Sequence, residues 1–194
     1  MHLMKILALL GSPRKGNSEI LLNKAIELCQ KEKHKIHIIK AYELNISDCT
    51  ACDGCKDTGQ CIISDDMDLV YPLLRQVHRI IIASPIFFFG IPGQLKLLID
   101  RCQCLWYEKY VLKKPISEEE FKRKALIMLV GGMKKGQIGV TCAEATLKAF
   151  LRTINVNEHS TLSYLGYDEP GSILKSLDVI KDLEFSVAQL LKND

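Results

Sequence analysis

Four of the eight cysteines in this 194-residue chain lie close together. The stretch from Cys49 to Cys55 reads C-x2-C-x2-C, and Cys61 follows after five further residues. Three thiols at intervals of three, with a fourth shortly after, can wrap a compact cuboidal cluster, and this spacing is characteristic of [4Fe–4S] ligands. The spacing therefore predicts an iron–sulfur site whose ligands are Cys49, Cys52, Cys55 and Cys61.

The spacing of these thiols leaves three alternatives to a cluster open. Structural zinc usually takes two cysteine pairs separated by a longer loop, so zinc fits the spacing less well. Disulfides are disfavoured in a reducing cell, and reactive or merely structural thiols are the remaining alternative. Elsewhere, Cys29 falls on the apolar face of a predicted helix, and Cys102 and Cys104 are two apart, so on a helix they face different directions.

A second segment with candidate binding residues, GSPRKGNS, runs from Gly11 to Ser18. It lies between an apolar stretch and a predicted helix. Backbone N–H groups and the helix dipole attract an anion at such a position. Ser12, Asn17 and Ser18 add side-chain donors, and Arg14 adds a permanent cation that strengthens its hydrogen bonds to an anion. We expect this loop to bind phosphate, the alternative being a capped turn without a ligand.

The loop also discriminates between kinds of phosphate ligand. Asn17 stands where the nucleotide-triphosphatase loop needs the lysine that reaches the β- and γ-phosphates. Pro13 stands where the dinucleotide fingerprint needs its second glycine. A hydroxyl-lined loop with one arginine instead suits a terminal phosphomonoester.

A third segment, SPIFFFGIPG, begins at Ser84 after the most β-branched apolar run of the chain. Three consecutive aromatic residues cannot all point into one core face, although core packing is the alternative for any one of them. Two glycines that end another apolar run allow close backbone approach. We expect both loops to offer a surface for a flat ring, formed by Pro85, Ile86, Phe87, Phe88, Phe89, Gly90, Gly131, Gly132 and Met133.

The elements that must position these segments alternate along the chain. Strand-like runs cover 5–10, 35–41, 80–84, 124–130 and 161–165, and helical patterns cover 65–77, 92–104, 140–154 and 173–192, with a further helix capped by Asn17 or Ser18. Continuously apolar strands are buried on both faces, which indicates a parallel sheet in a doubly wound α/β fold. Ligands of such sheets bind beyond the carboxyl ends of the strands. A cysteine-rich segment at 46–64 and a charged segment at 105–123 fit the pattern poorly.

Over roughly Lys5 to Leu165, the segments GSPRKGNS and SPIFFFGIPGQLKLLIDR resemble the NAD(P)H-dependent FMN reductase-like branch of the flavodoxin-like superfamily. The resemblance implies a flavodoxin-like doubly wound five-stranded parallel sheet of order 2-1-3-4-5, with helices on both faces. It places the FMN phosphate on Ser12, Arg14, Asn17 and Ser18 and the ring against the two later loops, and it implies NAD(P)H as an electron donor. The family often has Tyr where this chain has Phe87, so a phenolic hydrogen bond near the flavin is missing.

The cysteine segment resembles the iron–sulfur flavoproteins, a subgroup with a C-x2-C-x2-C-x4–7-C motif in this place. In that subgroup the cluster passes electrons to FMN and the protein is oligomeric. The sequence thus predicts a flavin-dependent oxidoreductase that exchanges electrons between a [4Fe–4S] cluster and FMN, with no acid–base residue assigned. The alternatives are an NAD(P)H-dependent FMN or quinone reductase without a cluster, and a non-catalytic flavodoxin-type electron carrier.

Composition and charge argue against some classes of binding partner. The net charge of +3, without a Lys/Arg run, argues against nucleic acid. The longest apolar run, 80–91, is too short to span a membrane, and without a cleavage pattern near the start we expect one cytoplasmic domain over 1–194. A ferredoxin-like or small-molecule redox partner is expected.

The sheet order also bears on assembly. In a 2-1-3-4-5 sheet the second strand is an edge strand, at least two spacings of about 4.8 Å from the third. The cysteine segment follows that edge strand, whereas the flavin ring is expected beyond the third and fourth. We therefore expect a homodimer or tetramer in which 105–123, with Trp106, Tyr107 and Tyr110, is an oligomerisation arm.

Overall fold

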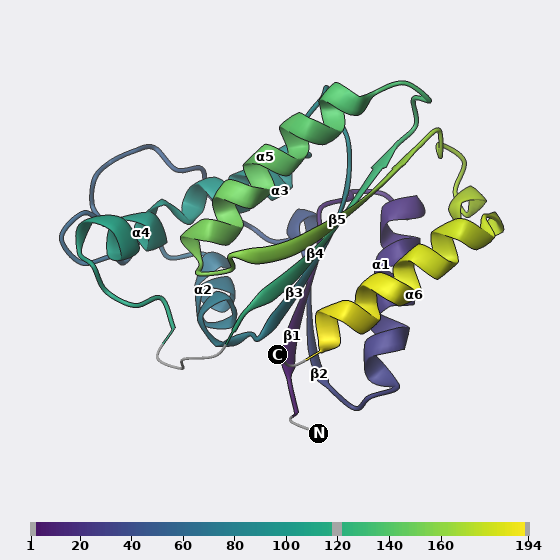
Figure 1. The fold of residues 1–194 in the computed structure, drawn as a ribbon. Helices are drawn as coiled ribbons and strands as arrows, with labels where there is room; N and C mark the ends of the chain where they lie inside the picture. Colours follow the sequence, from purple (N-terminus) through teal and green to yellow (C-terminus); the bar gives the residue numbers. More distant parts are fainter. Residues whose placement is uncertain (1–2, 118–121, 193–194) are drawn as a thin grey trace.

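The computed structural model of this protein describes residues 3–117 and 122–192. Its centre is a five-stranded sheet of order β2-β1-β3-β4-β5 in which every neighbouring pair is parallel (Figure 1). The strands are β1 (Lys5–Leu10), β2 (Lys35–Lys40), β3 (Arg79–Pro85), β4 (Lys124–Gly131) and β5 (Glu158–Leu165). This arrangement confirms the predicted fold class and strand order.

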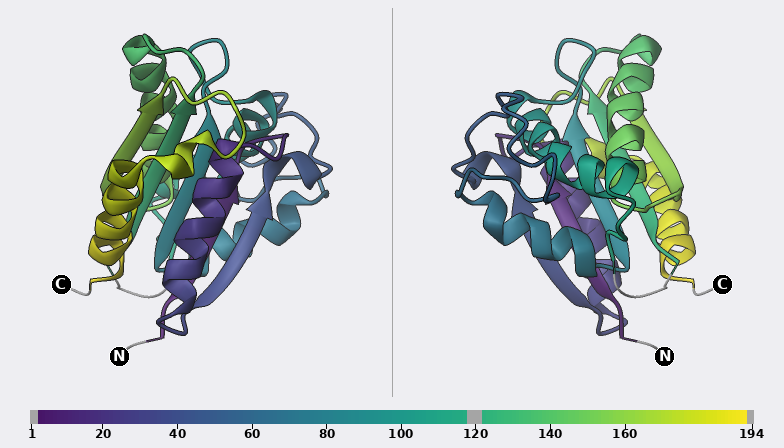
Figure 2. Two further views of the ribbon diagram at one scale, coloured as in Figure 1. Left: turned by 90° about the vertical axis from the view of Figure 1, so that its right-hand side faces the viewer. Right: turned by 90° about the vertical axis from the view of Figure 1, so that its left-hand side faces the viewer.

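Helices cover both faces of the sheet (Figure 2). One face carries α1 (Asn17–Gln30) and α6 (Leu177–Leu191), and the other carries α2 (Met67–Gln76), α3 (Gly93–Arg101), the short α4 (Gln103–Trp106) and α5 (Gln137–Thr153). A π-helical turn, Tyr107–Val111, continues α4, and 3-10 turns span Ala41–Glu43 and Ser172–Lys175. Within the described residues, no helix is both long and apolar enough to cross a membrane.

The alternation of side chains along each strand divides the core into two layers. In β1, Ile6, Ala8 and Leu10 face α1 and α6, whereas Leu7 and Leu9 face the opposite helices. The central strands β3 and β4 are buried on both faces, which explains their continuous apolar runs. By contrast, the edge strand β2 is half-exposed along its length.

Several boundaries differ from the sequence-based expectation. The predicted capping of the first helix by Asn17 or Ser18 is wrong, because the extended residue Gly16 precedes α1 and no side chain caps it. β5 begins at Glu158 rather than near Thr161, since pairing with β4 runs from Lys124↔Glu158 onward. The helix expected over 92–104 breaks at Cys102, which separates α3 from α4.

The two segments that fitted the pattern poorly lie on the same side of the molecule. Residues 46–64 form an irregular loop beside α4, on the face of the sheet that carries α2, α3 and α5 (Figure 1). In the arm expected at 105–123, the first part continues α4 as the π-helical turn, and 118–121 lie outside the described residues.

Candidate functional site

The first loop, 11–16, joins the carboxyl end of β1 to α1 as a compact turn. A side-chain carbon on Gly11 would lie 2.6 Å from Leu95 Cδ2, so the close approach of this loop to α3 requires glycine. The Ser12 hydroxyl donates to the Arg14 carbonyl at 2.8 Å and accepts from the Arg14 N–H at 3.4 Å. This turn is followed directly by the first N–H groups of α1, which have no partner inside the helix.

Arg14 and Ser18 are the side chains of this loop that an incoming anion can recruit. Arg14 pairs with Asp168 at 3.1 Å, and the two side chains are 62% and 77% exposed. An exposed ion pair contributes only about 0–1 kcal/mol, so a phosphate could replace the carboxylate at little cost. Ser18 is buried, and its hydroxyl makes no hydrogen bond to any of the residues described.

Asn17 lies beside the same loop but uses its side chain differently. Its amide donates to the carbonyls of Tyr167 and Glu169 at 3.1 and 2.9 Å, and its carbonyl accepts from the Gly171 N–H at 2.9 Å. These bonds hold the loop after β5 next to the loop after β1. A direct bond from the Asn17 side chain to phosphate, expected from the sequence, stays a prediction.

A cavity of about 280 Å³ lies beyond the carboxyl ends of β3, β4 and β5. It contains six of the nine residues predicted to face a flat ring, namely Ile86, Phe88, Phe89, Gly131, Gly132 and Met133. Pro85 is the last residue of β3, and Phe87 and Gly90 belong to the adjoining loop. Leu165 and Gly136 also line it, and no sequence pattern predicted them. Leu165 comes to the cavity only because the pairing of β4 with β5 places it opposite Gly131.

The aromatic loop at this cavity is a strained turn. Phe87 and Gly90 exchange two backbone hydrogen bonds of 2.9 Å, while Phe88 and Phe89 both have positive φ, 47° and 61°. Such turns prefer Asn-Gly, and a non-glycine residue in this region costs on the order of 1–3 kcal/mol. Phe88 is also fully exposed. The side chains of Phe88 and Phe89 therefore lie at the surface rather than in the core.

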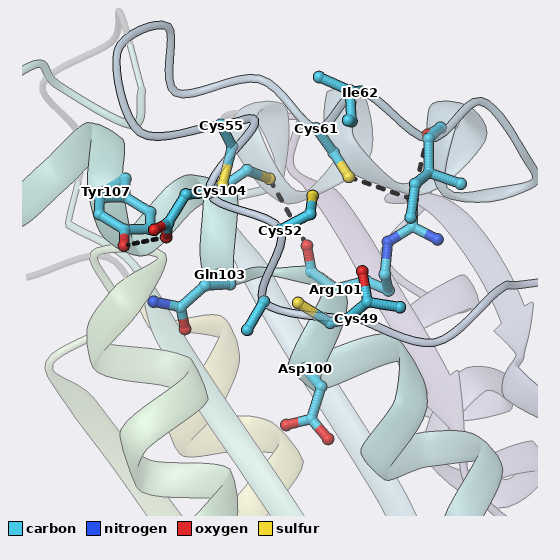
Figure 3. A pocket seen from close by; sticks show the side chains of 14 residues that line it. Cys49, Cys52, Cys55, Cys61, Ile62, Asp100, Arg101, Gln103, Cys104 and Tyr107 are labelled. Atoms are coloured by element: carbon cyan, nitrogen blue, oxygen red, sulfur yellow. Dashed lines mark hydrogen bonds between the residues drawn. The ribbon is translucent and has the colours of Figure 1, made fainter.

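A second cavity, of about 270 Å³, collects the thiols of the cysteine-rich segment (Figure 3). Cys49, Cys52, Cys55 and Cys61 all line it, and their role as ligands stays a prediction. Cys104 lines it too, from α4, while Cys102 lines a separate cavity beside Trp106. The two helical cysteines thus face different directions, as expected, but one of them reaches the cluster of thiols.

The thiols of this cavity lie close enough to influence one another. Burial, followed by the nearby Cys104, raises the pKa of the Cys55 thiol, and Cys61 and Cys49 add smaller effects. No three His, Cys, Asp or Glu side chains within 3–117 and 122–192 converge as ligands of a single metal ion. In a four-iron cluster each cysteine binds a different iron, so four thiols around one cavity fit that group.

The two cavities are separate. They have no lining residue in common. One is lined by residues at the carboxyl ends of β3, β4 and β5, whereas the other is lined by residues of α3, α4 and the loop of 46–64. That the cysteine segment stands apart from the flavin of its own chain stays a prediction.

Comparison with known proteins gives a consistent result. The family model for NADPH-dependent FMN reductase matches residues 4–164. An iron–sulfur flavoprotein from Methanosarcina thermophila is 33% identical over 134 residues, which cover 69% of this chain and 66% of that protein. Another, from Methanocaldococcus jannaschii, is 34% identical over 103 residues, or 53% of each chain. The chain thus spans between about half and two thirds of the length of these relatives.

Solved structures show the same fold. An NAD(P)H:quinone oxidoreductase from Methanothermobacter marburgensis superposes with a TM-score of 0.76 at 15% identity, covering 100% of this chain and 98% of the other. A flavone reductase gives 0.70 at 18% identity, covering 96% of this chain and 62% of that one. At these identities the similarity concerns the fold alone.

Proposed function

Since this chain belongs to the NADPH-dependent FMN reductase family, we propose that it is an FMN-dependent oxidoreductase that exchanges electrons between FMN and a [4Fe–4S] cluster. The observation that carries this proposal is the pair of cavities. One offers an apolar surface for a flat ring, and the phosphate-type loop follows β1, the strand that pairs with β3 at this end of the sheet. The other collects four cysteines at cluster spacing. The relatives named iron–sulfur flavoproteins support the second part.

Ser12, Arg14 and Ser18 hold the phosphate together with the first N–H groups of α1. Asn17 keeps the loop after β5 in place beside them. Ile86, Phe88, Phe89, Gly131 and Gly132 line the cavity that would take the ring. FMN supplies the redox chemistry, and the protein supplies orientation and an apolar surround that excludes water.

In the second site Cys49, Cys52, Cys55 and Cys61 hold the cluster. FMN can take one electron or two, whereas a cluster takes one at a time. A protein with both groups therefore connects a two-electron donor, such as NAD(P)H, to one-electron carriers.

Selective loss of FMN tests the phosphate site. Replacing Arg14 and Ser18 together by alanine removes two charge-assisted contacts, at a cost of about 3–5 kcal/mol in FMN affinity. Riboflavin lacks the phosphate, so its affinity should change little. As the opposite control, Asp168→Asn frees Arg14 from its counter-ion and should strengthen FMN but not riboflavin. Equal losses for both flavins would place the phosphate elsewhere.

Analysis of protein purified without oxygen tests the cluster. We expect one FMN and close to four iron and four sulfide per chain, with a broad visible absorption that a chelator removes. A flavin spectrum without iron would identify a cluster-free FMN or quinone reductase instead. Retained zinc would identify a structural metal.

A further inference from the structure

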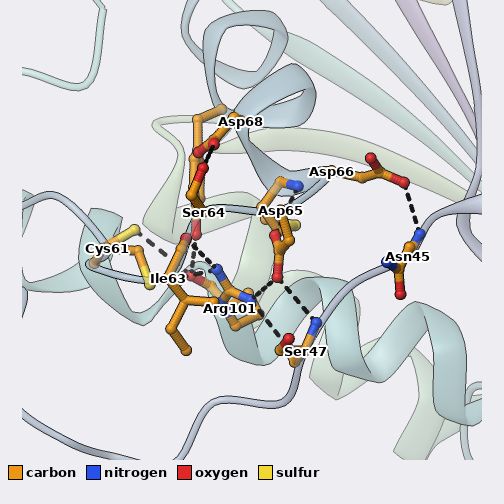
Figure 4. A network of polar contacts seen from close by, with 12 residues as sticks. Asn45, Ser47, Cys61, Ile63, Ser64, Asp65, Asp66, Asp68 and Arg101 are labelled. Atoms are coloured by element: carbon orange, nitrogen blue, oxygen red, sulfur yellow. Dashed lines mark hydrogen bonds and ion pairs between the residues drawn. The ribbon is translucent and has the colours of Figure 1, made fainter.

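Arg101 is a buried charge at the end of α3, and it forms part of the wall of the cysteine cavity (Figure 4). Its side chain is completely buried. A buried cation is costly unless its charge and its donors are matched by partners. The partners of this guanidinium therefore indicate why the fold retains it.

The two arms of the guanidinium reach both ends of the cysteine segment. Nη1 donates to the Ser47 carbonyl at 2.9 Å, two residues before Cys49. Nη2 donates to the Ile63 carbonyl at 3.1 Å and to the Cys61 sulfur at 3.4 Å. One planar group thus connects the residues on either side of all four predicted ligands and also contacts one of the ligands.

Asp65 holds this arrangement together. Its carboxylate accepts from Arg101 Nη1 at 2.5 Å and from the N–H groups of Ser47 and Met67 at 2.9 and 3.0 Å. Burial alone would raise the pKa of Asp65, but these hydrogen bonds outweigh it and lower that pKa below its ordinary value. The carboxylate therefore stays charged opposite Arg101 at neutral pH.

The guanidinium also has an unused donor. Arg101 Nε is buried and has no hydrogen-bond partner among the described residues. A group whose only task was to complete an ion pair would gain from satisfying this N–H. Arg101 lines the thiol cavity, and no described residue around the cysteines uses this N–H.

We infer that Arg101 is a positioning residue for the four-cysteine site: it fixes both ends of the segment 47–63, and its N–H bond to Cys61 raises the reduction potential of the cluster. The first part stands on the contacts alone, and the second rests on the proposed function. A hydrogen bond to a ligand sulfur favours the more negative, reduced state, so the potential rises. The charge of Arg101 is itself balanced by Asp65, so the hydrogen bond carries this effect.

The variants Arg101→Met and Arg101→Lys test both the positioning role and the effect on the reduction potential. Arg123→Met is the matched control. Arg123 is likewise buried and donates to the backbone carbonyls of Val77, Ile154 and Leu74, which lie outside the cysteine segment. Both Met variants should lose stability. An effect that appears in Arg101→Met but not in Arg123→Met therefore reports on the cysteine site rather than on the general loss of stability.

Hydrogen exchange of iron-free protein tests the positioning role. Backbone amides of 47–63 should exchange at least tenfold faster in Arg101→Met than in wild type and the control. Arg101→Lys should also exchange fast, because a single ammonium cannot span both ends of the segment. Wild-type exchange in Arg101→Met, or full protection by lysine, would overturn this part.

A redox titration of the loaded protein, followed by electron paramagnetic resonance, tests the second part. The cluster midpoint should fall in Arg101→Met, lie nearer wild type in Arg101→Lys, and stay unchanged in Arg123→Met. An unchanged midpoint in Arg101→Met would overturn the effect on potential. If wild-type protein binds no iron, the proposed function fails, whereas the exchange experiment still decides the positioning role.

Discussion

At the residue scale, the cysteines differ in their environment, and this difference indicates which of them are available as ligands. Cys29 is buried between α1 and the sheet, and burial together with Glu32 raises its pKa to about 12. Burial also raises the pKa of Cys102 well above its ordinary value. Neither thiol lines the cysteine cavity, and both lie among apolar core residues. These two cysteines therefore serve packing, as the sequence pattern indicated for Cys29.

The ligand set can be tested one thiol at a time. Alanine at Cys49, Cys52, Cys55 or Cys61 should each abolish iron retention after anaerobic reconstitution, since each removes one of four bonds to the cluster. Cys104→Ser should keep iron, although Cys104 shares the cavity, because its sulfur donates to the Arg101 carbonyl from within a helix.

Cys29→Ala is the control for general damage, and iron and sulfide per flavin are the measurements. Loss of iron in Cys104→Ser, combined with retention in any one of the four alanine variants, would show that Cys104 is a ligand in place of a motif cysteine.

At the scale of elements, the strained turn between β3 and α3 connects stability with function. Positive φ at Phe88 and Phe89 stores strain that lowers the stability of the fold. Residues held in this way concentrate at ligand-binding loops. The turn thus presents aromatic surface where a ring is expected to lie.

Replacing the strained residues should raise the stability of the fold and lower its affinity for flavin. Phe88→Asn with Phe89→Gly installs the preferred residues for this turn and should raise the free energy of unfolding of the flavin-free protein by about 1–2 kcal/mol. FMN affinity should fall, because two ring-facing side chains are lost. Urea unfolding and flavin titration measure the two effects.

Lys33→Gly is the matched control, because Lys33 also has positive φ, 61°, but lies between α1 and β2, away from the cavity. It should gain stability without losing flavin affinity. Unchanged FMN affinity in the turn variant would remove Phe88 and Phe89 from the flavin site.

At the scale of the whole molecule, the separation of the two cavities concerns assembly. Trp106, Tyr110 and Val111 are between 38% and 47% exposed on α4 and the turn that follows. The neighbouring Tyr107 lines the cysteine cavity and donates to Asp53 at 3.0 Å. Exposed aromatic residues beside a functional cavity are typical anchors of an interface. We therefore predict a homodimer or tetramer in which the cysteine segment of one chain approaches the flavin of another.

Replacing Trp106 and Tyr110 together by alanine should shift the loaded protein toward monomer in sedimentation and slow electron transfer between flavin and cluster. Phe185→Ala, which removes an exposed aromatic residue from α6, should do neither. A wild-type monomer that reduces its cluster through FMN at the full rate would contradict the predicted assembly.

The strand order and the family followed from a resemblance, whereas the sequence by itself determined the alternation of strands and helices, the segment GSPRKGNS and the four motif cysteines. These features are local, because apolar runs and short spacings are written within a few residues of each other. Only the tertiary structure decided the partner of Asn17, which lies 150 residues away at Tyr167, and the contact of Arg101 with Cys61, 40 residues away. It likewise brought Cys104 and Leu165 to the two cavities. Such contacts depend on how helices and strands pack against one another, and no local pattern records that.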